Sequence, residues 1–176
     1  NCGSSFCAPL HGESRRVGEE RVGLYGVGPI MDWTTFDEYL AKLEMAGSTL
    51  NLATQVGHGT VRTAVLGFED RAPTPEELDR MRGLVAESLD AGALGFSTGL
   101  YYAPGSYART DEVVTLAKEA ARRGKLYSTH MRDEGDSTIS LFGSIEETLA
   151  IGRLSGVRVQ LSHLKCAAPS VWGRTL

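Results

Sequence analysis

The sequence predicts an α/β fold built around a parallel β-sheet. Short segments of strand-like composition recur along the chain, an amphipathic helical pattern separates each one from the next, and successive strands lie about 30 to 45 residues apart. This spacing is typical of right-handed β-α-β crossovers. A closed eight-stranded barrel and an open doubly wound sheet both contain such units. The open sheet is less favoured, because neither phosphate-binding pattern, GxxxxGK(S/T) or GxGxxG, occurs in the chain.

Helices and strands alternate in this prediction. The expected elements are, in chain order, a helix over 32–46, a strand over 48–56, a helix over 74–92, a strand over 93–98, a helix over 110–123, a strand over 125–130, a helix over 137–154 and a strand over 157–163. A further strand is implied just before Cys2. Because these strands are fewer than the eight of a closed barrel, we expect the chain to be cut from something longer.

Capping residues justify the first helix. Residues 32–46 carry apolar side chains at helical spacing, and Gly47 provides the stop. The candidate caps are Asp32, Thr34 and Thr35. This segment is therefore expected to be an amphipathic helix.

The later elements have similar signals. The stretch from Thr74 to Glu77 combines a Thr cap, a proline in the first turn and an acidic residue three positions after the threonine. The helix over 110–123 opens with Thr-Asp-Glu and stops at Gly124. The strands are predicted from composition, since each segment is short, rich in residues that suit a strand and bounded by glycine or polar residues.

Composition limits the classes of function. Eighteen Lys and Arg against 22 Asp and Glu give a net charge of -4, which argues against nucleic acid and anionic membranes as partners. No run of about 18 apolar residues occurs, so no spanning helix is expected. The three cysteines contain no CxxC pair, which favours a reducing compartment and a cytoplasmic location. Cys7 and Cys166 are interpreted as structural.

Two histidines stand at predicted strand ends. In a parallel α/β fold, the functional residues lie where the strands end, because the loops there share one mouth. His130 ends the strand over 125–130, and His163 ends the strand over 157–163. Adjacent parallel strands lie about 4.8 Å apart, so the two imidazoles can reach one ion between them. A hydrogen-bonded pocket wall is the alternative interpretation for each histidine.

Cys2 follows the implied strand and allows three interpretations. It is a small buried hydrophobic residue, a thiolate ligand that shares zinc with the histidines, or a nucleophile activated by His130. The residues around it do not separate these three.

Other polar and aromatic residues lie near the predicted carboxyl ends of the strands, and each has a structural interpretation. The acids of Arg132-Asp133-Glu134 are expected to cap the next helix and solvate the loop. Lys165 is either solvated or a cation for an anionic substrate group. Tyr101 and Tyr102 suit a lid or pocket wall, with aromatic packing as the alternative.

The sequence contains two further histidines, His58 and His11. His58, between two glycines, is either a turn with close backbone approach or part of a substrate-facing loop. His11 precedes a charged stretch that contains glycine and is expected at the surface.

Five stretches together resemble the N-acyl-D-amino-acid deacylases (D-aminoacylases) of the amidohydrolase superfamily. In chain order they are Asn1-Cys2-Gly3 with Ala8-Pro9-Leu10, Val56 to Arg62 (VGHGTVR), Gly95 to Leu100 (GFSTGL) with Tyr102 and Pro104-Gly105, Ser128 to Gly135 (STHMRDEG), and Leu161 to Lys165 (LSHLK). The resemblance implies that residues 1–176 are one partial domain of a metal-dependent (β/α)8 TIM barrel. It would cover about strands 2 to 6 with the intervening helices, truncated at both ends.

The resemblance also implies a mechanism. Zn²⁺ would be held by Cys2, His130 and His163, the thiolate replacing the bridging carboxylated lysine of related enzymes. Tyr102 and Lys165 would bind the α-carboxylate of the substrate, an N-acyl-D-amino acid. Metal-bound hydroxide would attack the amide carbonyl and release a carboxylate and a free D-amino acid.

The chain also departs from the family pattern. The His-x-His pair of the first strand and the aspartate that serves as proton shuttle are absent from it, so both are expected outside this chain, and the fragment alone is expected to be incomplete. Position 101 is Tyr where relatives often carry Glu. The alternatives are a non-catalytic barrel fragment and a cyclic-amide hydrolase similar to dihydroorotase or hydantoinase. Cyclic-amide hydrolases typically use a carboxylated lysine, so Cys2 counts against the second alternative.

Overall fold

The structure is a computed structural model that describes residues 7–24 and 31–174. Its helices are α1 (Glu13–Gly23), α2 (Phe36–Ala46), α3 (His58–Leu66), α4 (Pro75–Ala91), α5 (Thr110–Arg122) and α6 (Ser140–Ser155), with short 3₁₀ turns η1 (Gly105–Tyr107) and η2 (Pro169–Val171). Its strands are β1 (Val56–Gly57), β2 (Gly95–Gly99), β3 (Leu126–His130) and β4 (Arg158–Leu161). No helix in this described part combines the length and the apolar composition needed to cross a bilayer.

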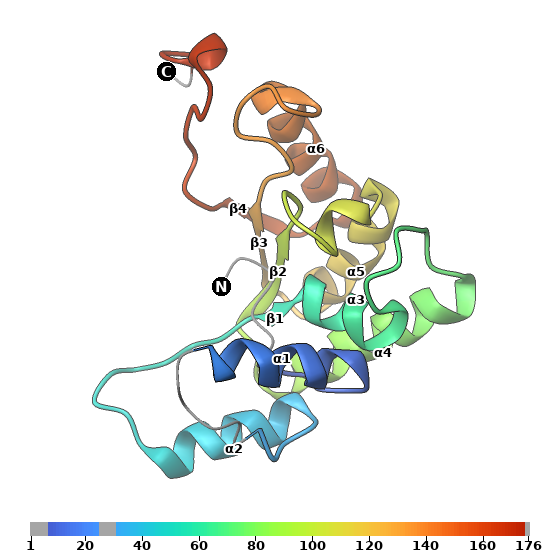
Figure 1. Cartoon of the computed structure of the whole chain (residues 1–176), viewed down its shortest axis with the longest axis vertical. Coiled ribbons are helices and arrows are strands. Elements are labelled where there is room, and N and C mark those ends of the chain that lie inside the picture. The colour runs from blue at the N-terminus through green and yellow to red at the C-terminus, as the bar shows by residue number, and fades with distance from the viewer. Residues whose placement is uncertain (1–6, 25–30, 175–176) are drawn as a thin grey trace.

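The strands form one parallel sheet in the order β1-β2-β3-β4 (Figure 1). Each strand pairs with the next one in the chain, and at least one helix lies in every crossover. A doubly wound sheet reverses its strand order at a switch point, whereas these described strands follow one another without a reversal. The α/β prediction is confirmed, and the strand order is that of an arc of a barrel.

The apolar core lies between the sheet and helices α3 to α6, which gather on one side of it (Figure 1). Phe96 of β2 and Tyr127 of β3 are neighbours in register, are fully buried and stack with ring centroids 5.9 Å apart. Full burial of such a side chain contributes about 1.5–3 kcal/mol. Because side chains alternate along a strand, Ser128 and His130 lie on the opposite face, away from the helices.

The predicted caps form at two helices. The Thr74 hydroxyl accepts a hydrogen bond from the backbone N–H of Glu77, and the Glu77 carboxylate accepts one from the backbone N–H of Thr74. Thr35 and Glu38 form the same reciprocal pair at the start of α2. The helix predicted from residue 32 therefore begins later, at Phe36, because Thr35 provides the cap.

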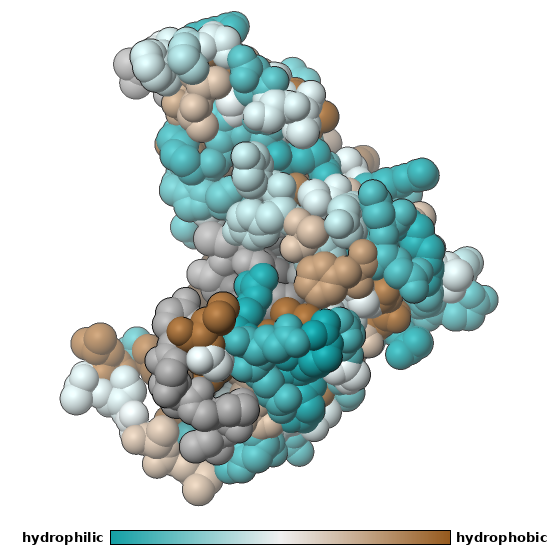
Figure 2. Space-filling view, in the orientation of Figure 1, coloured by the Kyte–Doolittle hydropathy of each residue, from teal (hydrophilic) through white to brown (hydrophobic). Residues whose placement is uncertain are grey.

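The strand predicted over 48–56 is mostly wrong, since only Val56 and Gly57 pair with β2. The segment before them is irregular, with Leu50 and Leu52 74% and 59% exposed. Figure 2 shows hydrophobic side chains on the surface at the end of the molecule that carries α2 and this segment. The Thr54 carbonyl still accepts a hydrogen bond from the backbone N–H of Leu94, but the pairing does not continue further back along this segment, so no longer strand forms.

Two helices were not predicted. The charged stretch after His11 forms α1, which buries Ser14 and Val17 and packs against α3. Its few apolar residues leave hardly any helical pattern to detect. Helix α3 begins directly at His58, where the sequence indicated a turn or loop, and it buries almost all of its residues.

His58 belongs to a buried charged network, so its prediction as part of a substrate-facing loop is wrong. Its Nε2 lies 2.8 Å from Glu112 Oε1, and Arg62 Nη1 lies 2.9 Å from Glu112 Oε2. The three side chains are at most 3% exposed. Arg62 also donates hydrogen bonds to the carbonyls of Glu69 and Arg71. The network thereby fastens α3 to the first turn of α5.

The Glu112 carboxyl has a lowered pKa despite its burial. Burial alone raises its pKa, but the hydrogen bond with His58 and the positive charges beside it outweigh that effect. Glu112 is therefore charged at neutral pH and balances the buried guanidinium of Arg62.

Replacing Glu112 by Gln is expected to lower the free energy of unfolding by about 3 kcal/mol at pH 7, since it leaves the Arg62 charge buried without a counterion. A group with a depressed folded pKa stabilises above its unfolded pKa, and this contribution is lost as pH falls through the folded value. The difference between wild type and variant should therefore shrink below about pH 4. Urea denaturation at pH 7 and at a pH below about 4 measures this difference in the free energy of unfolding. The exposed Glu87→Gln is the control, and an equal loss at both pH values would contradict the assignment.

Candidate metal centre

The carboxyl ends of β2, β3 and β4 bring the predicted site residues together. His130 is the last residue of β3, and His163 follows β4 by two residues. Their ring centroids lie 4.4 Å apart. The side chain of His130 is 15% exposed and that of His163 is 41% exposed, so the pair sits at the mouth of the sheet rather than in its core.

Strand pairing alone does not bring the two histidines together. They do not lie at the same level, because β4 ends at Leu161, which pairs with Thr129, and Ser162 donates its backbone N–H to the Thr129 carbonyl. His163 therefore lies one residue beyond the level of His130. Its backbone has a positive φ of 39°, outside the strand conformation. This turn, and not strand alternation, places its ring against His130.

Glu134 is the functional residue that the sequence interpretation missed. It was expected to solvate the loop after β3, but its side chain is only 8% exposed. Its Oε1 lies 2.8 Å from His163 Nδ1, and its Oε2 forms an ion pair with Lys165 Nζ. Oε2 lies 3.8 Å from His130 Nε2. No local sequence signal marks this acid, because its partners His163 and Lys165 lie 29 and 31 residues further along the chain.

The donor set fits a divalent metal ion. One ligand atom from each of His130, Glu134 and His163 can be chosen so that all three lie within 4.8 Å of one another. Burial lowers the pKa of His130, as do the charges of His163 and Lys165, while Glu134 opposes them. The lowered pKa favours the neutral imidazole, which is the form that binds metals. Imidazole nitrogen is an ordinary ligand of zinc, and a carboxylate at this distance can either bind the ion or orient a histidine that does.

Asp133 organises the loop that carries Glu134. Its carboxylate is buried and accepts hydrogen bonds from the backbone N–H groups of Gly135, Thr138 and Ser140. Burial by itself raises the pKa of this carboxyl, but these hydrogen bonds outweigh it and lower the pKa below its ordinary value. The prediction that Asp133 solvates the loop is therefore wrong, because the side chain turns inward and fixes the backbone.

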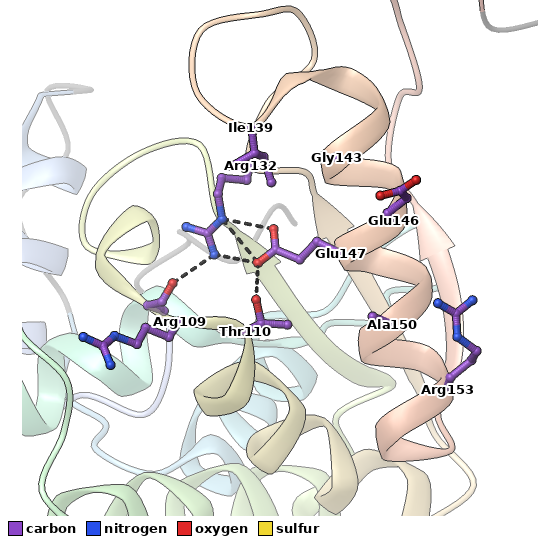
Figure 3. Close-up of a pocket in the computed structure, with 10 residues that line it drawn as sticks. Arg109, Thr110, Arg132, Ile139, Gly143, Glu146, Glu147, Ala150 and Arg153 are labelled. Carbon is purple, nitrogen blue, oxygen red and sulfur yellow. Dashed lines mark hydrogen bonds and ion pairs between the residues drawn. The ribbon is translucent and has the colours of Figure 1, made fainter.

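Arg132 also turns away from solvent and from the histidines. Its guanidinium forms an ion pair with Glu147 of α6 (Figure 3). It also donates hydrogen bonds to the carbonyls of Ser106 and Ala108. Glu147 in turn accepts a hydrogen bond from Thr110. These side chains form one wall of a cavity of about 790 Å³ on the helical side of the fold, separate from the histidines. Arg132 thus ties the loop after β2 to α6.

Two tyrosines flank His130 on the side of β2. The ring centroid of Tyr102 lies 5.1 Å from that of His130, and the centroid of Tyr101 lies 5.9 Å from it. Both tyrosines, His130 and Glu134 line a cavity of about 390 Å³. Lys165 Nζ lies 3.1 Å from His163 Nδ1, and its side chain is 52% exposed at the same mouth. The structure therefore places Tyr102 and Lys165 beside the histidine pair.

None of the three cysteines is seen at the histidine pair in the described part of the chain. Cys2, the third predicted zinc ligand, lies outside the described residues. Cys7 and Cys166 are half-buried, and Cys166 packs against the small apolar cluster of Met131, Leu141 and Val171.

Comparison with known proteins agrees with this geometry. The chain is 38% identical to an N-acyl-D-glutamate deacylase of Alcaligenes xylosoxydans xylosoxydans and 40% identical to an N-acyl-D-aspartate deacylase of the same organism. Each match covers 99% of this chain and 34% of the relative. The expected resemblance is confirmed. The chain spans about a third of the length of the curated relatives it matches, and no family model matches it.

Solved structures show the same fold. A D-aminoacylase studied for its binuclear metal centre superposes with a TM-score of 0.86 at 35% identity. An N-acyl-D-glutamate deacylase from Bordetella bronchiseptica, complexed with zinc and a phosphonate that mimics the tetrahedral intermediate, superposes with a TM-score of 0.82 at 38% identity. Both matches cover 99% of this chain and 35% of the other.

Replacing Asp133 by Asn is expected to loosen the loop after β3, because an amide presents one acceptor oxygen where the carboxylate presents two charged ones. Hydrogen bonds to charged groups contribute about 1.5–3 kcal/mol. Hydrogen exchange at the amides of Gly135, Thr138 and Ser140 should accelerate. The nearby exposed Asp136→Asn serves as control, and unchanged protection in the Asp133 variant would refute this role.

Proposed function

We propose that the full-length protein is a zinc-dependent amidohydrolase that cleaves the amide bond of N-acyl-D-amino acids. The products are a carboxylate and a free D-amino acid. The observation that carries the proposal is the convergence of His130 and His163 at the carboxyl ends of β3 and β4, in a chain similar over nearly all its length to deacylases of this specificity. Because the chain covers a third of those relatives, the activity is proposed for the whole protein.

His130 and His163 would hold the zinc, with Cys2 as the proposed third ligand. When bound, zinc lowers the pKa of a water ligand and polarises the amide carbonyl. The lowered pKa of His130 supports this assignment, since it keeps the imidazole lone pair available. The proton-shuttle aspartate and the His-x-His pair would come from the remainder of the protein.

Lys165 and Tyr102 would bind the α-carboxylate of the substrate. The Lys165 ammonium has three N–H donors and gives one to Glu134, so others remain for a substrate anion. The rings of Tyr101 and Tyr102 cover one side of His130 and would exclude water from the reacting amide.

The proposed function also implies an architecture and a cellular location for the full-length protein. We propose that residues 1–176 form about strands 2 to 6 of a (β/α)8 barrel. Support comes from the uninterrupted order of the described strands and from helices α3 to α6, which lie on one side of the sheet (Figure 1). His130 would then face the barrel interior. A cytoplasmic location is proposed because the sequence has three cysteines and no CxxC pair.

The full-length protein is expected to hydrolyse N-acetyl-D-glutamate or N-acetyl-D-methionine faster than their L forms, with activity lost to a chelator and restored by zinc. His130→Ala should lower kcat/KM about 100-fold or more, because metal activation supplies several kcal/mol. The exposed His11→Ala is the matched control. Equal rates on both enantiomers, or rates insensitive to chelation, would rule out the proposal.

Lys165→Met is expected to lower kcat/KM for N-acyl-D-amino acids by about 10- to 100-fold, chiefly through KM, since a charge-assisted contact contributes about 1.5–3 kcal/mol. The α-carboxamide analogue of the same substrate should be affected little, because it has no anion to lose. Steady-state kinetics with both compounds measure the contrast, with the exposed Lys118→Met as control. A similar loss on both compounds would mean that Lys165 does not bind the carboxylate.

A further inference from the structure

We propose that Glu134 is a positioning residue that fixes the metal-binding imidazole of His163 and the ammonium of Lys165 in one arrangement. The inference rests on the proposed function, which makes one of these groups a zinc ligand and the other the anchor of the substrate carboxylate. Glu134 itself would contact neither zinc nor substrate.

Both oxygens of the Glu134 carboxylate are in use. Oε1 lies 2.8 Å from His163 Nδ1, and Oε2 forms an ion pair with Lys165 Nζ. A buried carboxylate is costly unless it is paired and hydrogen-bonded, so these two partners hold the side chain where it is. The shared carboxylate also holds its two partners close together, since Lys165 Nζ lies 3.1 Å from His163 Nδ1.

The contact with His163 selects one tautomer. A carboxylate beside Nδ1 accepts a hydrogen bond from the N–H form of that nitrogen, and in this tautomer Nε2 is the ring nitrogen that can bind a metal ion. His163 needs such support more than His130 does, because it lies outside the strand, has a positive φ and is the more exposed of the two.

The main chain of Glu134 acts in the same direction. Its carbonyl accepts a hydrogen bond of 2.7 Å from the backbone N–H of Ala167. Glu134 therefore binds the segment after β4 through both its side chain and its backbone. The neighbouring Asp133 carboxylate fixes the loop from which Glu134 projects. One residue thus joins the loops that follow two adjacent strands.

This arrangement favours positioning over direct ligation. Both carboxylate oxygens already have partners, since Oε1 contacts His163 Nδ1 and Oε2 is paired with the ammonium of Lys165. Removing Glu134 would release the imidazole and the ammonium together. Zinc affinity and recognition of the substrate carboxylate should therefore weaken in the same variant.

The test uses the full-length protein and four variants: Glu134→Gln, Lys165→Met, their double mutant and Glu119→Gln. Glu119 is the matched control, because it is also a buried carboxylate among cations, pairing with Arg82, Arg122 and Arg123 away from the site. Two quantities are measured: zinc affinity by competition with a chromophoric chelator, and the ratio of kcat/KM for an N-acyl-D-amino acid to that for its α-carboxamide analogue.

Glu134→Gln is expected to weaken zinc binding by about 10- to 100-fold, the range found when residues that orient metal ligands are removed. It should lower the kcat/KM ratio about tenfold, as a lost charged contact would. The double mutant should lower that ratio no further than Lys165→Met alone, because both changes disable the same contact. Glu119→Gln should leave both quantities unchanged.

Three outcomes would overturn the inference. Wild-type zinc affinity and substrate ratio in Glu134→Gln would show that Glu134 positions neither group. Loss of zinc stoichiometry at saturating zinc would make it a ligand. Additive losses in the double mutant would separate it from Lys165. If the wild type has no chelator-sensitive deacylase activity, the proposed function fails, and the zinc measurement still tests the contact with His163.

A measurement on the unmutated protein guards against variants that fail to fold. The ¹⁵N shifts of His163 should report the Nδ1–H tautomer with and without zinc, and the opposite tautomer would refute the assignment. Glu134→Asp offers a milder change, since it keeps the charge but withdraws it by one methylene. It should give losses between those of wild type and Glu134→Gln.

Discussion

The shared carboxylate of Glu134 is the interaction on which the candidate metal centre depends. Parallel pairing brings the ends of β3 and β4 side by side, but it leaves His163 one residue beyond the level of His130. The register therefore supplies proximity without alignment. The link between Glu134 and His163 completes the alignment, and the same carboxylate adds Lys165 to the group. Strand pairing and one acid thus divide the task of building the site.

A second shared carboxylate performs the corresponding task on the helical side. Glu112 pairs with His58 and Arg62 and joins two helices, as Glu134 joins two loops. The surroundings differ, since the Glu112 network is closed from solvent whereas His163 and Lys165 remain 41% and 52% exposed. A sealed network can only stabilise the fold. In the open one, His163 and Lys165 lie at the mouth of the sheet, where a ligand can reach them.

The sequence predicts those features whose cause is local. Thr74 and Glu77 lie three residues apart and form the expected cap, and His130 stands where a strand was expected to end. The prediction fails where distant partners decide the outcome. The segment around Leu50 has a strand-like composition but stays irregular and exposed, and Glu134 is directed inward by a histidine 29 residues further along the chain. No local pattern tells such an acid from a solvated one.

The way Arg132 holds the loop after β2 has a consequence for how this surface can change. Its hydrogen bonds run to the backbone carbonyls of Ser106 and Ala108, so the anchoring is indifferent to the side chains at those positions. Tyr101, 54% exposed, is likewise free of any structural duty within the apolar core. The loop can therefore accept new side chains while its path stays constant. This is a scaffold on which selectivity can diversify, in nature or by directed evolution, without rebuilding the centre beneath it.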